Sequence, residues 1–180
     1  VNSAITDIQN IDPESANISQ ERLESLVAES KVLRAYHYMK LMDLFGNIPI
    51  VTQVGEPQNP ATASREEVFA FVESELLENV ESLQPLSQSL LGRVSKAVGY
   101  AILSELYLNA EVWSGEPRWQ ESIEYADKVI NGEGGALMGS MALDQDPLGP
   151  FSNQNELSPE NIFQFPFSRE NGFGYDWRAF

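Results

Sequence analysis

The chain has 180 residues, 42% of them hydrophobic, which suits one domain with a real core, or two at most. Its net charge of −16, from 11 basic and 27 acidic residues, argues against nucleic acid or anionic lipid as partners, because both need clustered Lys and Arg. The sequence contains no cysteine and no apolar run near the roughly 20 residues that a membrane-spanning helix needs.

Two helices are predicted near the start of the chain. Residues 1–11 have apolar side chains at helical spacing, and the residue before Pro13 is pushed out of the helical region. Because the chain begins with valine inside this pattern, we expect the true start, with any targeting signal, to lie upstream. Residues 20–45 predict a long helix that is apolar nearly all round after Ala35, which indicates deep burial, and Gly46 is a natural stop.

The middle of the chain predicts a long loop and then more helices. Residues 46–63 are rich in Pro, Gly and Asn and predict the irregular loop. Ser64 and Glu67 have the spacing of a capping box at a helix start. Three helices are expected from apolar periodicity, at residues 65–83, 95–112 and 117–130.

A repeat is visible in these helices. The last two, from Ala97 to Asn131, span 35 positions, close to the roughly 34 of a tetratricopeptide unit. Ala28 and Tyr38 of the long helix recur 69 positions later as Ala97 and Tyr107. The sequence therefore predicts an all-α fold that resembles tetratricopeptide repeats, with two stacked antiparallel helix pairs.

The C-terminal part is expected to be small and irregular or extended. Residues 132–180 are rich in Gly, Asp, Asn and Pro, and one short strand is predicted at residues 162–167, where Phe163, Phe165 and Phe167 would share a face. We accordingly expect a helical repeat over residues 1–131, and the loop-rich start of an incomplete second half after it.

No catalytic or metal-binding constellation is found. The single histidine, His37, lies in the apolar part of a helix and is predicted to be a core residue, and no zinc-protease motif, nucleophile elbow or phosphate loop occurs. The glutamates between Glu73 and Glu81 are read as a solvated helix face. Asp144 and Asp146 are spaced like the start of a calcium loop, but Leu148 stands where a third oxygen ligand belongs. We predict no enzyme activity, no cofactor and no metal.

Three other side chains have two readings each. Arg34 could hold a ligand carboxylate, but a structural ion pair is the favoured reading. Trp113 and Trp119 flank a helix–helix turn and are expected to pack inside the repeat.

The favoured ligand-binding residues are Trp177, Tyr175 and Asp176. They follow turn glycines without helical periodicity, and glycines leave a backbone free to present a ring. An aromatic face can stack on the C–H face of a sugar while nearby polar groups bond its hydroxyls. The alternative is that these aromatic residues pack against chain further downstream.

Three segments together resemble the SusD/RagB family. The sequence LRAYHY, residues 33–38, leads into the sequence LFGNIPIV, residues 44–51. The sequence GRVSKA, residues 92–97, is followed by AILSELYL, and ENIFQF, residues 160–165, completes the order. The spacing matches over nearly the whole chain.

The resemblance implies a surface-exposed outer-membrane lipoprotein that captures a glycan or another oligomeric nutrient and delivers it to a SusC-like TonB-dependent transporter, without hydrolysing it. Family members carry lipid on an N-terminal cysteine and are much longer, so the lipid anchor is expected upstream of Val1. The alternative function is a tetratricopeptide scaffold that binds a protein partner. A plain scaffold would continue the roughly 34-residue period. This chain instead leaves the repeat after Asn131, which favours a function in nutrient uptake.

Overall fold

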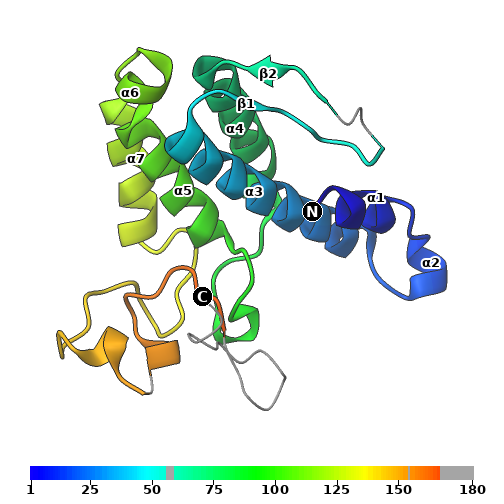
Figure 1. Cartoon of the computed structure of the whole chain (residues 1–180). Coiled ribbons are helices and arrows are strands. Elements are labelled where there is room, and N and C mark those ends of the chain that lie inside the picture. Colours follow the sequence, from blue (N-terminus) through cyan, green and yellow to red (C-terminus); the bar gives the residue numbers. More distant parts are fainter. Residues whose placement is uncertain (56–58, 154, 167–180) are drawn as a thin grey trace, which may run out of the picture.

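The computed structural model describes residues 1–55, 59–153 and 155–166. Helices dominate this part of the chain (Figure 1). The α-helices are α1 (Asn2–Gln9), α2 (Pro13–Ala16), α3 (Gln20–Phe45), α4 (Arg65–Asn79), α5 (Lys96–Leu108), α6 (Ala110–Ser114) and α7 (Trp119–Ile130). Short 3-10 helices are η1 (Val80–Ser82), η2 (Gln88–Leu90), η3 (Gly149–Phe151) and η4 (Asn155–Leu157), and the two strands are β1 (Ile48–Pro49) and β2 (Thr62–Ala63).

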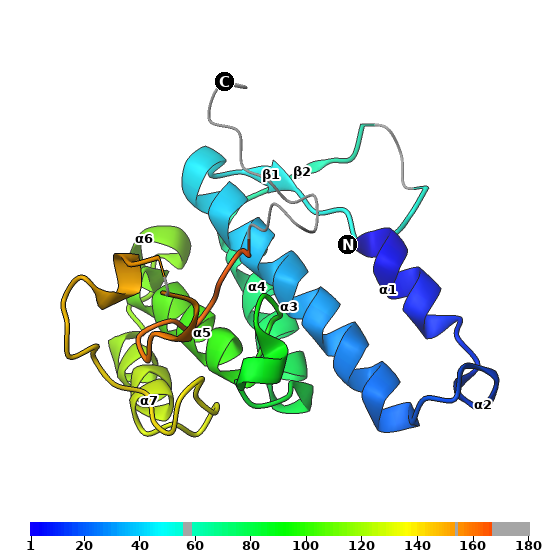
Figure 2. The same cartoon turned by 90° about the horizontal axis from the view of Figure 1, so that it is seen from below.

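Two helix pairs form the body of the fold, which confirms the predicted repeat. α3 packs against α4, and α5 packs against α7. The first pair is antiparallel, because Asn47 just after α3 accepts a hydrogen bond from the backbone N–H of Arg65 at the start of α4, while α3 also contacts η1 at the other end of α4. The helix α1 lies along the N-terminal half of α3 (Figure 2).

The local signals at the helix ends are mostly confirmed. The Ser64 side chain accepts from the Glu67 N–H and the Glu67 carboxylate accepts from the Ser64 N–H, so the capping box is present. Gly46 ends α3 with φ of 73°. Two boundaries were wrong: Pro117 lies outside α7, which begins at Trp119, and the helix predicted at residues 95–112 divides at Asn109 into α5 and α6.

The loop between α3 and α4 is tied back to the helices. β1 and β2 pair antiparallel, with Ile48 opposite Ala63. The Tyr38 hydroxyl donates to the Val51 carbonyl at 3.0 Å and accepts from the Val51 N–H at 2.7 Å. These bonds hold the start of the loop against α3.

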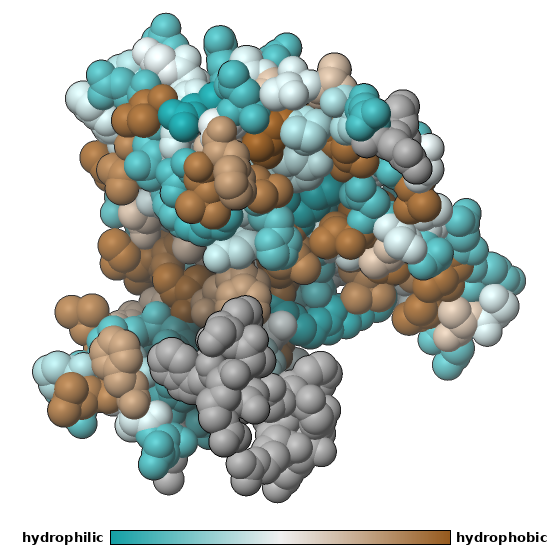
Figure 3. Space-filling model, viewed as in Figure 1, coloured by the Kyte–Doolittle hydropathy of each residue, from teal (hydrophilic) through white to brown (hydrophobic). Residues whose placement is uncertain are grey.

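One face of α3 forms the centre of the core, but the predicted burial all round was wrong. The inward side chains recur at steps of three and four and are fully or almost fully buried: Ala28, Val32, Ala35, Met39 and Met42. His37, Leu44 and Phe45 are instead exposed. Among the described elements α3 contacts α1, α4 and α5, and Figure 3 shows hydrophobic surface near the C-terminal end of this helix.

After α7 the chain forms turns and loops, as expected. The strand predicted at residues 162–167 does not form over residues 162–166, which are the described part of that range. Residues 162–166 make no strand pairing, and Phe167 lies outside the described residues. A strand needs a neighbouring strand that forms hydrogen bonds with its backbone. Among the described residues after α7, the only β-bridge joins Gly135 to Leu86, and it does not involve residues 162–166. Side-chain contacts hold residues 162–166 instead.

Candidate functional site

A surface pocket lies in the loop-rich segment after α7. It has a volume of about 590 Å³. Amide, carboxylate and aromatic side chains dominate its lining: Asn153, Asn155, Glu156, Asn161, Gln164 and Phe165. Side chains of these types can donate and accept hydrogen bonds beside an apolar face.

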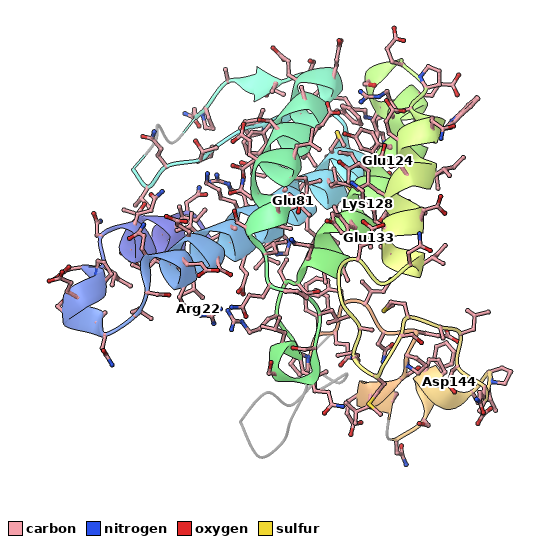
Figure 4. All side chains as sticks on the ribbon, turned by 180° about the vertical axis from the view of Figure 1, so that it is seen from behind. Arg22, Glu81, Glu124, Lys128, Glu133 and Asp144 are labelled. Atoms are coloured by element: carbon pink, nitrogen blue, oxygen red, sulfur yellow. The ribbon has the colours of Figure 1, made fainter. Side chains whose placement is uncertain are left out.

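A network of hydrogen bonds fixes the loop that carries the pocket. The Asp144 carboxylate accepts from the Ser158 hydroxyl at 2.9 Å and from the Asp146 N–H at 3.1 Å. The Glu160 carboxylate accepts from the Asp144 N–H at 2.6 Å. Figure 4 shows Asp144 among the 3-10 turns, away from the helix pairs. Asp144 and Asp146 therefore act as turn residues, and the described residues contain no group of three potential metal-ligating side chains.

An aromatic series links the pocket to the helical core. Phe165 is 57% exposed, and its ring centroid lies 4.7 Å from that of Phe163. Phe163 in turn meets Tyr36 of α3 edge to face, with centroids 5.7 Å apart. Figure 2 shows this part of the chain, in orange to red, passing α5 toward α3. The exposed Phe165 ring therefore packs on Phe163, which Tyr36 in turn supports.

Backbone carbonyls orient three amides of the pocket. Asn155 donates to the Pro150 carbonyl at 3.0 Å. Asn161 donates to the Asn155 carbonyl at 2.5 Å, and Gln164 donates to the Glu156 carbonyl at 2.8 Å. Each bond uses one N–H, whereas an amide carries two N–H groups and an acceptor oxygen. The pocket therefore presents amides whose orientation is already set.

A second pocket, of about 430 Å³, lies between α1 and α3 and has different chemistry. Its lining is aliphatic and polar and includes no aromatic side chain: Ile8, Ile11, Leu23, Val27, Glu24 and Asn79. Nearby, Arg34 forms a buried ion pair with Glu75, which confirms its structural reading. Glu75 was predicted to be solvated, and its burial corrects that prediction.

Buried phenols of the helix pairs show the strongest electrostatic perturbation. Burial, and then a hydrogen bond to Glu73, raise the pKa of Tyr107. Burial and a hydrogen bond to Glu81 likewise raise the pKa of Tyr100. Lys128 lies over the Tyr100 ring, 5.4 Å from its centroid, and Figure 4 shows Lys128 and Glu81 on neighbouring elements. These groups join neighbouring helical elements, and none of them lines the pocket after α7.

The residues favoured from sequence cannot be compared with this pocket. Trp177, Tyr175 and Asp176 lie outside the described residues. Trp113 is buried as expected, but Trp119 is exposed, so the prediction that both pack inside the repeat was half wrong.

Sequence reasoning missed the pocket itself. Its amides lie in a stretch assigned to loop, and Phe165 was assigned to a strand. The density of Asn and Gln between residues 153 and 164, beside alternating phenylalanines, is the signal that could have indicated it.

Antiparallel helix pairs followed by a loop-rich, pocket-bearing segment define a tetratricopeptide-like helical repeat protein. None of the described helices is both long and apolar enough to cross a membrane. Within that class, the chain belongs to the SusD-like family described as starch-binding associating with outer membrane, whose match covers residues 1–108.

Individual relatives agree with this assignment. The starch-binding protein SusD of Bacteroides thetaiotaomicron is 34% identical over 103 residues, which make up 57% of this chain and 18% of that protein. A SusD superfamily structure from Parabacteroides distasonis has a TM-score of 0.74 at 24% identity, over 94% of this chain and 35% of that one. Surface glycan-binding protein A from Bacteroides fluxus has a TM-score of 0.73 at 22% identity, over 97% of this chain and 36% of that one. This chain thus spans about a third of the length of these solved relatives.

Proposed function

We propose that the protein to which this chain belongs is a non-catalytic glycan-binding component of an outer-membrane uptake system. The family match over residues 1–108 is the observation that carries the proposal. In this role the protein captures an oligosaccharide and passes it to a SusC-like TonB-dependent transporter, while a lipid upstream of Val1 anchors it at the cell surface. Residues 1–131 would form the helical repeat, and residues 132–180 would begin the second half.

The absence of hydrolysis is part of the proposal. An enclosed carboxylate pair is the usual equipment of a glycosidase, and among the described residues the carboxylates near the pocket are Glu156, which is exposed, and Asp144 and Glu160, which are engaged in turn hydrogen bonds. A scaffold for a protein partner is the weaker alternative, because the chain leaves the repeat after Asn131. Trp177, Tyr175 and Asp176 remain proposed ligand contacts.

The test uses the full-length protein and a panel of purified polysaccharides. We expect calorimetry to detect binding to at least one glycan, without release of reducing sugar from any of them. Affinity purification from outer-membrane extract should recover a TonB-dependent transporter. Reducing-sugar release would contradict the non-catalytic role, and the absence of binding across the panel would contradict glycan capture.

A further inference from the structure

We propose that the pocket between Asn155 and Phe165 is a subsite for an uncharged sugar ring, an inference that rests on the glycan binding proposed above. The pocket combines one exposed aromatic ring, several oriented amides and one carboxylate. Each of these three features restricts the ligand in a different way.

The aromatic ring restricts the ligand to one with an apolar face. A pyranose presents such a face where its C–H bonds align, and the negative face of an aromatic ring attracts these polarised hydrogens. Phe165 is 57% exposed, so its ring is open to a partner. Because Phe163, which itself packs on Tyr36, already contacts this ring, stacking a sugar on it costs little additional ordering.

The amides suit hydroxyl groups on the same ligand. A sugar hydroxyl both donates and accepts, and so does a side-chain amide. Asn161 and Gln164 each use one N–H on a backbone carbonyl, at 2.5 and 2.8 Å, which fixes the plane of the amide before a ligand arrives. Adjacent hydroxyls of one ring can therefore pair with groups that are already in place.

The charge of the pocket argues against acidic sugars. Glu156 is the only ionisable side chain among the described lining residues, so a uronate, sulfate or phosphate would meet a carboxylate without a compensating cation. Arg93, which lines a neighbouring pocket together with Gln164, is already paired with Glu29 at 2.5 Å. The net charge of −16 adds long-range repulsion of polyanions. The pocket is therefore selective for neutral rings.

The location is tested with matched phenylalanine variants of the full-length protein, using the neutral polysaccharide of the panel that binds most tightly. Phe165→Ala should weaken binding about tenfold, if aromatic stacking on bases is a guide to stacking on sugars. Phe165→Trp keeps an aromatic face and should retain most of the affinity. Phe151→Ala is the control, because Phe151 lies in the same loop-rich segment, is 83% exposed and is not among the residues that line the pocket.

The ligand class is tested with the same polysaccharide before and after oxidation of its primary alcohols to carboxylates. The wild type should bind the oxidised form less tightly than the neutral form, and Glu156→Gln should recover part of that loss, because the substitution removes the negative charge from the pocket. Unchanged discrimination in Glu156→Gln, or a wild type that prefers acidic polymers, would overturn the proposed selectivity.

The outcomes separate this inference from the function on which it rests. If the protein binds a glycan but Phe165→Ala behaves like Phe151→Ala, the subsite lies elsewhere and glycan capture stands. If no polysaccharide binds, glycan capture itself fails, and the inference fails with it. Unfolding curves for each variant show whether a loss of binding reflects a loss of folding, and Glu156→Gln provides the second measurement should Phe165→Ala not fold.

Discussion

Arg34 on α3 and Glu75 on α4 form a bidentate ion pair inside the first helix pair. Nε of Arg34 donates to Oε2 of Glu75 and Nη2 donates to Oε1, both at 2.7 Å. The remaining guanidinium nitrogen donates to Asn2 at 2.9 Å and to the Thr52 carbonyl at 3.1 Å. One cation thus joins α1, α3, α4 and the loop after β1.

Removal of one partner of this pair should be strongly destabilising. Glu75→Ala leaves the Arg34 charge buried without its carboxylate, and we expect a loss of about 3–5 kcal/mol in the free energy of unfolding. The matched control is Glu105→Ala on α5, whose carboxylate pairs with Lys40 at the surface and should contribute at most about 1 kcal/mol. Urea unfolding of both variants measures the difference, and equal losses would contradict the structural role of the buried pair.

The pair also shows how far the sequence alone could lead. Apolar periodicity correctly predicted α3 and α4, because each presents a regular buried stripe. Glu75 was read as solvated because it is charged, although it lies on that stripe, one turn after Val72 and one before Asn79. A charged residue on a buried stripe needs a partner, and Arg34 on the buried face of α3 is the complementary signal. The pairing itself depends on how the two helices align, which periodicity does not reveal.

The pocket was harder to predict from the sequence than the helices, because the sequence pattern of a segment does not identify the segment against which it packs. Alternation predicted that Phe163 and Phe165 share one face of a strand, and their rings are in contact, but residues 162–166 form no strand. The pattern does not specify whether a neighbouring strand exists. No described strand lies beside them, and Tyr36 on α3 provides the packing instead. The amides that face the pocket come from loop turns, whose course depends on bonds such as that between Ser158 and Asp144.

Two glycines after α7 should differ in their tolerance of a side chain. Gly132 and Gly135 both have positive φ, at 73° and 85°. A Cβ at Gly132 would meet nothing within 4 Å, whereas one at Gly135 would lie 2.5 Å from both the backbone nitrogen and the carbonyl oxygen of Leu86. Gly132→Ala should cost about 1–2 kcal/mol from backbone strain alone.

Gly135→Ala should cost clearly more than Gly132→Ala, because the chain must also move away from Leu86, where the N–H donates to the Gly134 carbonyl at 2.7 Å. Thermal unfolding followed by circular dichroism compares the two variants. Similar melting temperatures would show that the loop after α7 does not press against the chain before α5.

Alkaline pH should destabilise the protein through its buried phenols. The pKa of Tyr107 is raised above the ordinary phenol value of 10.0, first by burial and then by the 2.8 Å hydrogen bond to Glu73. Above pH 10 the unfolded chain therefore loses this proton while the folded chain retains it. The stabilisation is complete below pH 10 and is lost as the pH rises further.

Tyr107→Phe removes the titrating group together with its hydrogen bond. We expect a loss of about 0.5–1.5 kcal/mol at neutral pH and a shallower decline of stability above pH 10. A combined Tyr100→Phe and Tyr107→Phe variant should have a shallower decline still, because the pKa of Tyr100 is raised as well. Denaturant unfolding between pH 8 and about 11 gives the slopes, and a slope equal to that of the wild type would contradict this assignment.

Truncation of the two tryptophans at the α6–α7 turn should change stability by very different amounts, although the sequence predicted that both pack inside the repeat. Trp113 is 7% exposed and packs in the main core, whereas Trp119 is 57% exposed at the start of α7. Trp113→Ala leaves a cavity and should cost about 3–5 kcal/mol. Trp119→Ala should fall within about 0.5 kcal/mol of the wild type, as surface substitutions usually do. Urea unfolding of the full-length protein measures both values. A large loss for Trp119→Ala would show that another part of the protein covers this ring, and a small loss for Trp113→Ala would contradict the packing of α6 on the core.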